Sequence, residues 1–292
     1  MAGRSFGASV VNLARRDIDE LRTAFAGDGV ACIRGALDAT ALELAERTFQ
    51  WSLDHPGPSA RQVLAGRPGA FYQDHANPDA LPMHLALLRD TGLAELAALV
   101  LGSESLWLLY EQIWLKQGGD TLRTPWHQDL PYIPLEGNHV ATMWVPLDPV
   151  RRECALEFVR ASHRGPLFNP TAFDPDDPAA AMYADGVWPP LPDVESDRAA
   201  WPIVAWAVEP GDVILFHMAM LHGGAPTRAG ERRRTISLRF FGDHAYCAGR
   251  PESGLSAEDR LRRDDGGRDP IEQMAYAPPG SLFRHPGFAR LR

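Results

Sequence analysis

The spacing of apolar residues divides the chain into a helical first third and a β-rich centre. Apolar residues at i, i+3, i+4 and i+7 form one stripe along a helix. This spacing predicts helices after Asp38 and between Thr91 and Gly102, and early acidic residues followed by the stop Gly27-Asp28-Gly29 predict another over 17–27. The short apolar run 30–33 predicts one strand between the first two helices. The apolar stripes of these helices need a sheet or another helix to cover them.

From Ser105 onward the pattern changes to short runs rich in β-branched and aromatic residues, which are typical of strands. No helix of 10 to 15 residues alternates with these runs. The pattern therefore disfavours a parallel α/β sheet and favours an antiparallel sandwich or barrel with helices packed outside it. The runs are SLWLLYEQIWLK, HVATMWVPLD, ALEFV, DVILFHM and RTISLRFF.

The length of 292 residues and the 45% hydrophobic content fit one domain, 1–292, with one large core. We expect residues 1–104 to give mostly helical support, 105–243 to form the core, and 244–292 to be a loop-rich tail. The proline-rich segment 165–202 is too long for an ordinary connection. It is predicted to be a binding loop or lid, with surface padding as the alternative.

Charge and composition narrow the choice of partner. A net charge of −9 and a pI of about 5.6 disfavour a nucleic acid or an anionic membrane, since both select a basic surface. No run approaches the roughly 20 apolar residues of a membrane span, and no signal-peptide pattern opens the chain. The three cysteines lie far apart, without C-x-x-C spacing. We expect a cytoplasmic protein that acts on a small molecule; the oligomeric state is not predicted.

The stretch TPWHQDLPYIP places a histidine and an aspartate two positions apart in an apolar run. Side chains at i and i+2 of a strand share a side, so His127 and Asp129 can meet at one point. By itself the pair is explained equally well by a structural hydrogen bond. His222, which ends DVILFHMAMLH before two glycines, adds a second imidazole.

Two imidazoles and one carboxylate on one face of Fe(II) leave three coordination positions open. Zinc instead prefers a tetrahedral site with a third histidine or a nearby catalytic glutamate, and no H-E-x-x-H motif occurs. The sequence therefore favours a non-haem iron site. Two competing histidines are expected to be packed residues: His217 lies an odd number of positions before His222 on the same predicted strand, and His163 sits beside a turn.

Three consecutive arginines precede the predicted strand TISLRFF. If the apolar residues of this strand face the outer helices, Arg233 faces the interior with Thr235 and Ser237. Arg232 and Arg234 are then rim or surface charges. A guanidinium holds a carboxylate by two parallel hydrogen bonds, so Arg233 is the predicted anchor for a dicarboxylate co-substrate.

Taken together, the motifs resemble those of the phytanoyl-CoA dioxygenase-like branch of the Fe(II)/2-oxoglutarate-dependent oxygenases. WHQD at 126–129 resembles the proximal metal motif of that family. LEFVRASHRGP at 156–166 is similar to its L-x-x-x-P-G-S-H segment, with Arg160-Ala161 in place of Pro-Gly. EPGDVILFHMAMLHGGAPT resembles its distal histidine segment. The resemblance covers roughly 105–243.

The resemblance implies a mainly β fold with a double-stranded β-helix core of the jelly-roll, cupin-like type. It implies that His127, Asp129 and His222 hold Fe(II), with 2-oxoglutarate and O2 as co-substrates. Related halogenases lack the metal carboxylate, so the presence of Asp129 makes hydroxylation of a small molecule the expected reaction. Desaturation or ring formation needs the same ligands.

The resemblance also implies the contacts of the co-substrate. Arg233 is expected to bind its distal carboxylate, and Trp144 matches a family tryptophan near it. Gln112 is a candidate for the other carboxylate. Many members have serine or threonine two residues after the distal histidine, where this chain has Gly224. Thr227 is the candidate substitute.

Two other functions stay open at this point. One is a cupin-like metal-binding protein without oxygenase turnover, and the other is a metal-dependent isomerase or hydrolase. Arg233 argues against the hydrolase, which has no need of a dicarboxylate anchor. The substrate is not predicted, although Trp188 and Trp201 offer an apolar wall and Arg123 offers a partner for an acidic group.

Overall fold

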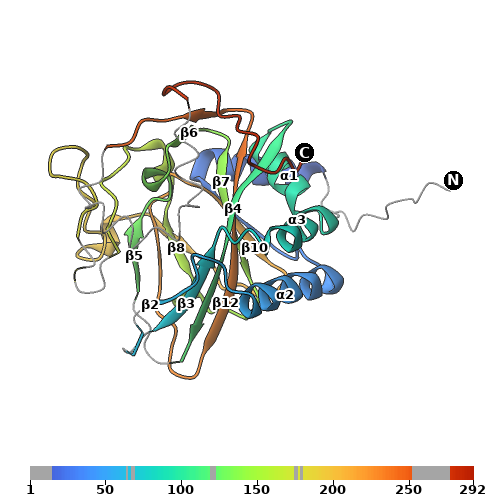
Figure 1. Cartoon of the computed structure of the whole chain (residues 1–292). Coiled ribbons are helices and arrows are strands. Elements are labelled where there is room, and N and C mark those ends of the chain that lie inside the picture. The colour runs from blue at the N-terminus through green and yellow to red at the C-terminus, as the bar shows by residue number, and fades with distance from the viewer. Residues whose placement is uncertain are drawn as a thin grey trace.

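The computed structural model describes residues 15–63, 65–66, 70–118, 123–173, 177, 180–251 and 277–292. Within these ranges the chain forms four α-helices and thirteen strands (Figure 1). All strand pairs are antiparallel, as predicted. No described helix is long and apolar enough to cross a membrane.

A seven-stranded sheet forms the larger half of the core. Its strand order is β1-β10-β7-β12-β4-β3-β2. The longest pairing in this sheet joins β12 to β4 and covers eleven residues of β12. The bounds are β1 (Val30–Ile33), β10 (Val213–His217), β7 (Val140–Pro146), β12 (Arg232–Gly242), β4 (Leu106–Gln117), β3 (Phe71–His75) and β2 (Arg61–Val63).

A four-stranded sheet packs against the inner face of the larger one. Its order is β5-β11-β8-β9, with β5 (Thr124–His127), β11 (His222–Gly224), β8 (Leu156–Val159) and β9 (Ile203–Ala205). Trp144, Ile214 and Phe216 of the large sheet meet Phe158 of the small one in a buried cluster. Two facing sheets filled by apolar side chains form the predicted jelly-roll core. A third sheet pairs β6 (Leu135–Gly137) with β13 (Ala245–Cys247).

Four helices cover the outer face of the large sheet: α1 (Arg15–Asp28), α2 (Ala39–Asp54), α3 (Leu81–Asp90) and α4 (Leu93–Leu101). Ile236, Leu238 and Phe240 of β12 are fully buried in one cluster with Phe49 of α2 and Leu96 of α4. The apolar residues of β12 therefore face the helices, as the alternation predicted. The three expected helices are present, and Asp38 accepts the hydrogen bond that caps α2.

The expectation of only one strand and three helices before residue 105 is wrong. Helix α3 begins after Ala80 without any side-chain cap, so its start carries no capping signal in the sequence. Strands β2 and β3 contain several polar residues and lie at the edge of the sheet, where β3 pairs with β4 and β2 pairs with β3. Such strands have little hydrophobic pattern of their own.

The segment 165–202 has no α-helix or strand among its described residues and is tied to the end of β5. The amide of Gln128 donates to the Pro166 carbonyl (3.2 Å) and accepts from the Phe168 N–H (2.9 Å). The indole of Trp126 donates to Glu195 (2.6 Å). These contacts hold both halves of the segment beside the motif WHQD at the end of β5.

The last residues of the chain form backbone hydrogen bonds with the start of β4. The backbone N–H groups of Leu106 and Leu108 donate to the carbonyls of Arg292 (3.3 Å) and Ala289 (3.0 Å). These bonds occupy the start of β4 that β3 does not reach. Residues 252–276 of the expected loop-rich tail lie outside the described residues.

The contact between β12 and the helices predicts a measurable contribution to stability. Leu238 is fully buried, so Leu238→Ala should lower the free energy of unfolding by about 2–5 kcal/mol, the usual range for such a truncation. Leu282 is 53% exposed, and Leu282→Ala is the matched control that should change it by less than about 0.5 kcal/mol. Urea denaturation monitored by tryptophan fluorescence measures both. Equal losses would contradict the assigned packing.

Candidate metal centre and active site

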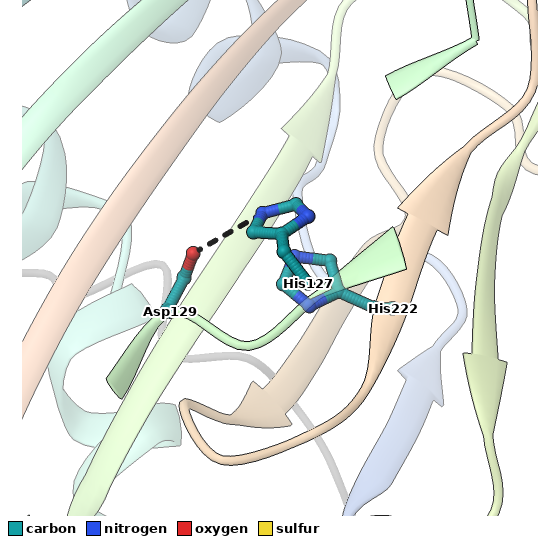
Figure 2. A group of neighbouring side chains, drawn as sticks. All are labelled: His127, Asp129 and His222. Carbon is teal, nitrogen blue, oxygen red and sulfur yellow. Dashed lines mark ion pairs between the residues drawn. The ribbon is translucent and has the colours of Figure 1, made fainter. Parts of the chain in front are cut away.

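Three side chains from distant parts of the chain meet between the two sheets. His127, Asp129 and His222 each offer one ligand atom, and these atoms lie within 4.8 Å of one another (Figure 2). The two imidazole centroids are 4.2 Å apart, and Nε2 of His127 is 3.7 Å from Oδ1 of Asp129. Among the described residues this is the one group of three or more such donors. The three predicted ligands are therefore brought together.

The backbone at Asp129 does not continue strand β5, contrary to the expectation from the sequence. Strand β5 ends at His127, and Asp129 has helical backbone angles just before a short 3₁₀ turn, Leu130–Tyr132. The two side chains therefore converge because the chain bends, and the expectation that they share one strand is wrong. Gln128 fixes the bend, since its amide donates to the Ala219 carbonyl at 2.8 Å.

His222 also lies on a different element from the one expected. The run DVILFHMAMLH is broken at 218–221, where the chain crosses from β10 in the large sheet to β11 in the small one. His222 then pairs directly with His127 across β11 and β5. His217 ends β10, where its ring accepts from the Ala219 N–H (3.1 Å) and contacts the Gly137 carbonyl (3.1 Å).

His217 and His163 are packed histidines, as expected. The reason why His217 does not join the metal ligands differs from the expected one. His217 and His222 lie on strands of different sheets, so their spacing along a single strand does not decide which way they face. Burial lowers the pKa of His217 to about 4. His163 contacts the Ala26 carbonyl through Nε2 at 3.3 Å and lies outside the three-residue group.

Backbone carbonyls fix the orientation of both ligand rings. Nδ1 of His127 is 2.9 Å from the Pro125 carbonyl, and Nδ1 of His222 is 3.0 Å from the Met220 carbonyl. A carbonyl only accepts, so each Nδ1 carries the proton and each Nε2 keeps its lone pair for a metal. Burial lowers the pKa of His222 to about 3, which keeps that ring neutral at physiological pH.

Asp129 is a buried carboxylate with two protein partners on one of its oxygens. The Thr142 hydroxyl donates to Oδ2 at 2.8 Å, and Nε of Arg239 lies 3.4 Å from the same oxygen. Burial alone would raise the pKa of Asp129, but the charge of Arg239 holds it well below its ordinary value. The carboxylate is therefore charged, and Oδ1 faces the imidazoles.

Sequence reasoning missed Arg239 and Thr142, although a signal for Arg239 exists. The alternation that places Arg233 and Ser237 inside also places Arg239 inside, two residues further along β12. Thr142 lies directly opposite Arg239 on β7. The donor set itself, two neutral imidazoles and one carboxylate, fits Fe(II) with three positions left open.

Two buried cations lie opposite each other further along the same interior face. Arg233 and Lys116 are directly paired between β12 and β4 and are 6% and 4% exposed. Nη1 of Arg233 donates to the carbonyls of Cys154 and Ala225, and Nζ of Lys116 donates to the Thr124 hydroxyl at 3.1 Å. Among the described residues, no carboxylate forms an ion pair with either.

The environment of these cations penalises their charge. Burial lowers the pKa of Arg233 to about 10. Burial, and secondarily the neighbouring Arg233, lowers the pKa of Lys116 well below its ordinary value. Arg233 was predicted to face the interior and does so. Lys116 was missed, although it lies at even spacing from Gln112 on the same strand.

The other residues predicted to contact the co-substrate lie at three separate places in the interior. Trp144 is buried opposite Ser237 on the interior face. Thr227 is buried and, with Arg233, lines a cavity of about 470 Å³. The carbonyl oxygen of Gln112 accepts from Nη1 of Arg239 at 3.1 Å, which places that amide beside the metal carboxylate.

The space beside Gly224 is taken by Thr124. A Cβ added to Gly224 would meet Thr124 Oγ1 at 3.2 Å and Leu156 Cδ2 at 3.4 Å. That Thr124 hydroxyl is the acceptor for Lys116. A hydroxyl of the neighbouring strand β5 therefore lies beside Gly224.

The residues suggested for the substrate side are engaged elsewhere. Arg123 pairs with Glu157 at 2.6 Å and with Glu195 at 3.2 Å, so it is not a free partner for an acidic group. Trp201 packs against a small buried cluster, and Trp188 lies edge-on to a tyrosine ring.

An exposed aromatic side chain that sequence reasoning missed, Phe173, lies beside the metal ligand His127. Its ring is edge-on to His127 (5.1 Å between centroids) and stacked on Tyr132 (5.6 Å). It is 44% exposed and has a positive φ of 53°, an uncommon conformation for this residue type. An exposed ring thus lies beside the first metal ligand.

Comparison with known proteins agrees with this geometry. The family model for phytanoyl-CoA dioxygenase matches residues 25–235, and the chain belongs to that family. A probable phytanoyl-CoA dioxygenase of Caenorhabditis elegans is 26% identical over 125 residues, which is 42% of this chain and 38% of the relative. The peroxisomal phytanoyl-CoA dioxygenase of Mus musculus is 27% identical over 147 residues, 50% of this chain and 40% of the relative. The chain thus spans less than half the length of these curated relatives.

Solved structures share the whole fold. The epimerase SnoN from nogalamycin biosynthesis, in complex with Fe3+, alpha ketoglutarate and nogalamycin RO, superposes with a TM-score of 0.69 at 22% identity, covering 96% of this chain and 100% of that one. EctD from S. alaskensis with bound Fe gives a TM-score of 0.60 at 18% identity, covering 90% and 88%. These similarities establish the fold.

The convergence of the three ligands predicts tight binding of a divalent metal. Asp129→Ala removes the only charged ligand of the set, so Fe(II) or Co(II) affinity should fall by more than about 100-fold, beyond the usual effect of changing a second-shell partner. Isothermal titration under anaerobic conditions measures this. His163→Gln is the matched control and should keep the wild-type affinity. Metal binding that survives Asp129→Ala unchanged would contradict the assignment.

Proposed function

We propose that the protein is an Fe(II)/2-oxoglutarate-dependent dioxygenase that hydroxylates an unactivated carbon of a small molecule and releases succinate and CO2. One observation carries the proposal. A buried set of two imidazoles and one carboxylate shares the interior of the jelly roll with a pair of buried cations, Arg233 and Lys116. A metal site alone would not require that pair.

The iron would be held by Nε2 of His127, Oδ1 of Asp129 and Nε2 of His222. When bound, iron and 2-oxoglutarate supply an oxidation that couples cleavage of a substrate C–H bond to decarboxylation of the co-substrate. The protein contributes fixed ligand orientations, because the carbonyls of Pro125 and Met220 hold the two rings. It also contributes a buried site from which bulk water is largely excluded.

Arg233 and Lys116 would bind the distal carboxylate of 2-oxoglutarate. Each crosses from the large sheet toward the small one, where Arg233 reaches two carbonyls and Lys116 reaches the Thr124 hydroxyl. Keeping two adjacent buried basic groups charged without an anion is unfavourable. An arriving carboxylate would relieve this penalty and could accept hydrogen bonds from both, which favours a dicarboxylate over a monoanion.

Phe173 and Tyr132 would form an apolar shelf beside His127 for the substrate. The stacked rings place apolar area next to the metal ligand, and the Tyr132 hydroxyl is fixed by a 2.7 Å bond to the Thr171 carbonyl. A small molecule with an apolar face could lie on this shelf with a carbon near the metal. The acidic net charge of the chain does not favour a nucleic acid there.

Binding of 2-oxoglutarate tests the function without knowledge of the substrate. Addition of 2-oxoglutarate to the anaerobic Fe(II) protein should produce a visible metal-to-ligand charge-transfer band. Arg233→Gln should raise the concentration needed for half of that band by about 100-fold, since it removes a buried charge-assisted pair. Arg232→Gln, which changes the neighbouring half-exposed arginine, should leave it nearly unchanged.

Turnover separates the proposed enzyme from its alternatives. Oxygenation should yield succinate from 2-oxoglutarate, and a substrate found by screening cell extract should gain one oxygen atom from 18O2. Succinate without product label would indicate desaturation, ring formation or epimerisation. The absence of both the visible band and succinate would refute the dioxygenase assignment.

The depressed pKa of Lys116 predicts a pH dependence of co-substrate binding. A bound carboxylate favours the charged ammonium, so the pKa of Lys116 must be higher in the complex than in the free protein. Binding therefore takes up a proton between those two pKa values, and affinity falls as pH rises through that window. Titration calorimetry in two buffers of different ionisation enthalpy measures the uptake. Lys116→Gln should abolish it, and affinity that rises with pH in the wild type would contradict the contact.

A further inference from the structure

We propose that Arg239 is a positioning residue that makes Asp129 a one-oxygen ligand and so keeps a coordination position open. The inference rests on the proposed iron and 2-oxoglutarate site and adds a residue to it. Arg239 is 8% exposed and lies on β12 directly opposite Tyr110 of β4 and Thr142 of β7. Its guanidinium is the described cation that pairs with the metal carboxylate.

The two oxygens of Asp129 have different surroundings. Oδ2 accepts from the Thr142 hydroxyl at 2.8 Å and lies 3.4 Å from Nε of Arg239. Oδ1 faces His127, with 3.7 Å to Nε2. The hydrogen bond from Thr142 and the ion pair with Arg239 therefore involve the same oxygen, and the other oxygen is directed into the ligand set.

The guanidinium is itself held from two further sides. Nη1 donates to the Gln112 carbonyl oxygen at 3.1 Å, and the group lies 4.7 Å from the centre of the Tyr110 ring. The pairing of β12 with β4 keeps one register from Arg232 to Arg239, which places Tyr110 opposite the arginine, and shifts only at Phe240, which pairs with Leu108. The cation is thus fixed independently of Asp129.

A buried ion pair is weak evidence of added stability, since desolvation offsets much of its attraction. The role of this ion pair is instead to fix the orientation of the Asp129 carboxylate. A carboxylate free to rotate can chelate a metal with both oxygens and would then occupy two of the six positions around Fe(II). With Oδ2 held by Arg239 and Thr142, Asp129 would supply one ligand atom, and the two histidines would supply two more. Three positions would stay available, two for 2-oxoglutarate and one for a diatomic ligand.

Nitric oxide tests this, because it binds the remaining position of the anaerobic Fe(II)–2-oxoglutarate protein and gives a characteristic S = 3/2 electron paramagnetic resonance signal. Wild type should show the signal at low nitric oxide concentration. Arg239→Gln should weaken nitric oxide binding by at least about tenfold while 2-oxoglutarate still produces its visible band, an effect in the range known for second-shell changes. Arg160→Gln, an exposed change of equal charge, is the control.

A second variant keeps the test decisive if Arg239→Gln does not fold. Thr142→Val removes only the hydroxyl that holds Oδ2 and should weaken nitric oxide binding in the same direction. Unchanged nitric oxide affinity in every folded variant would overturn the role of Arg239. Failure of wild type to form the 2-oxoglutarate band would instead refute the proposed function, so the two failures are distinguishable.

Discussion

The antiparallel pairing of β12 with β4 is the interaction on which the rest of the structure depends. Because side chains alternate along a strand, one face of β12 sends Leu238 and its apolar neighbours into the helices. The other face sends Arg233 and Arg239 into the jelly roll. A slip of one residue would put two arginines under the helices and leucine at the metal site, so core packing and site geometry enforce the same register.

The interior cations differ in how they are compensated, and the difference assigns their roles. Arg239 has its anion built in, since Asp129 lies 3.4 Å away and raises the pKa of the guanidinium against the effect of burial. Arg233 and Lys116 have lowered pKa values and no described carboxylate partner. Arg239 is therefore paired within the protein, whereas Arg233 and Lys116 have no ion-pair partner among the described residues. This asymmetry matches a resident metal ligand at one end of the site and an exchangeable dicarboxylate at the other.

The sequence predicted the site better than the path of the chain through it. The alternation of side chains placed Arg233 inside. The same rule would have found Arg239 further along β12, and Lys116 on β4. Hydrophobic pattern could not show that the apolar run around His217 crosses between sheets, because the corner at 218–221 is as buried as the strands it joins. It likewise could not show the bend that carries Asp129 off β5, since that bend depends on a tertiary bond from Gln128 to the Ala219 carbonyl. Segment 165–202 was recognised as a long loop, but only its contacts reveal that Phe173 reaches the metal ligand.

Strand β5 connects the two ends of the site. It begins at Thr124, whose hydroxyl contacts Lys116 and fills the space beside Gly224, and it ends at the ligand His127. A strand rises about 3.3 Å per residue, so these two residues are roughly 10 Å apart along it. That span supports the proposed binding of a five-carbon diacid, with one end on the metal and the other beside Arg233 and Lys116. The hydroxyl that position 224 lacks has a counterpart on the neighbouring strand, because Thr124 Oγ1 lies 3.2 Å from where a Cβ at Gly224 would be.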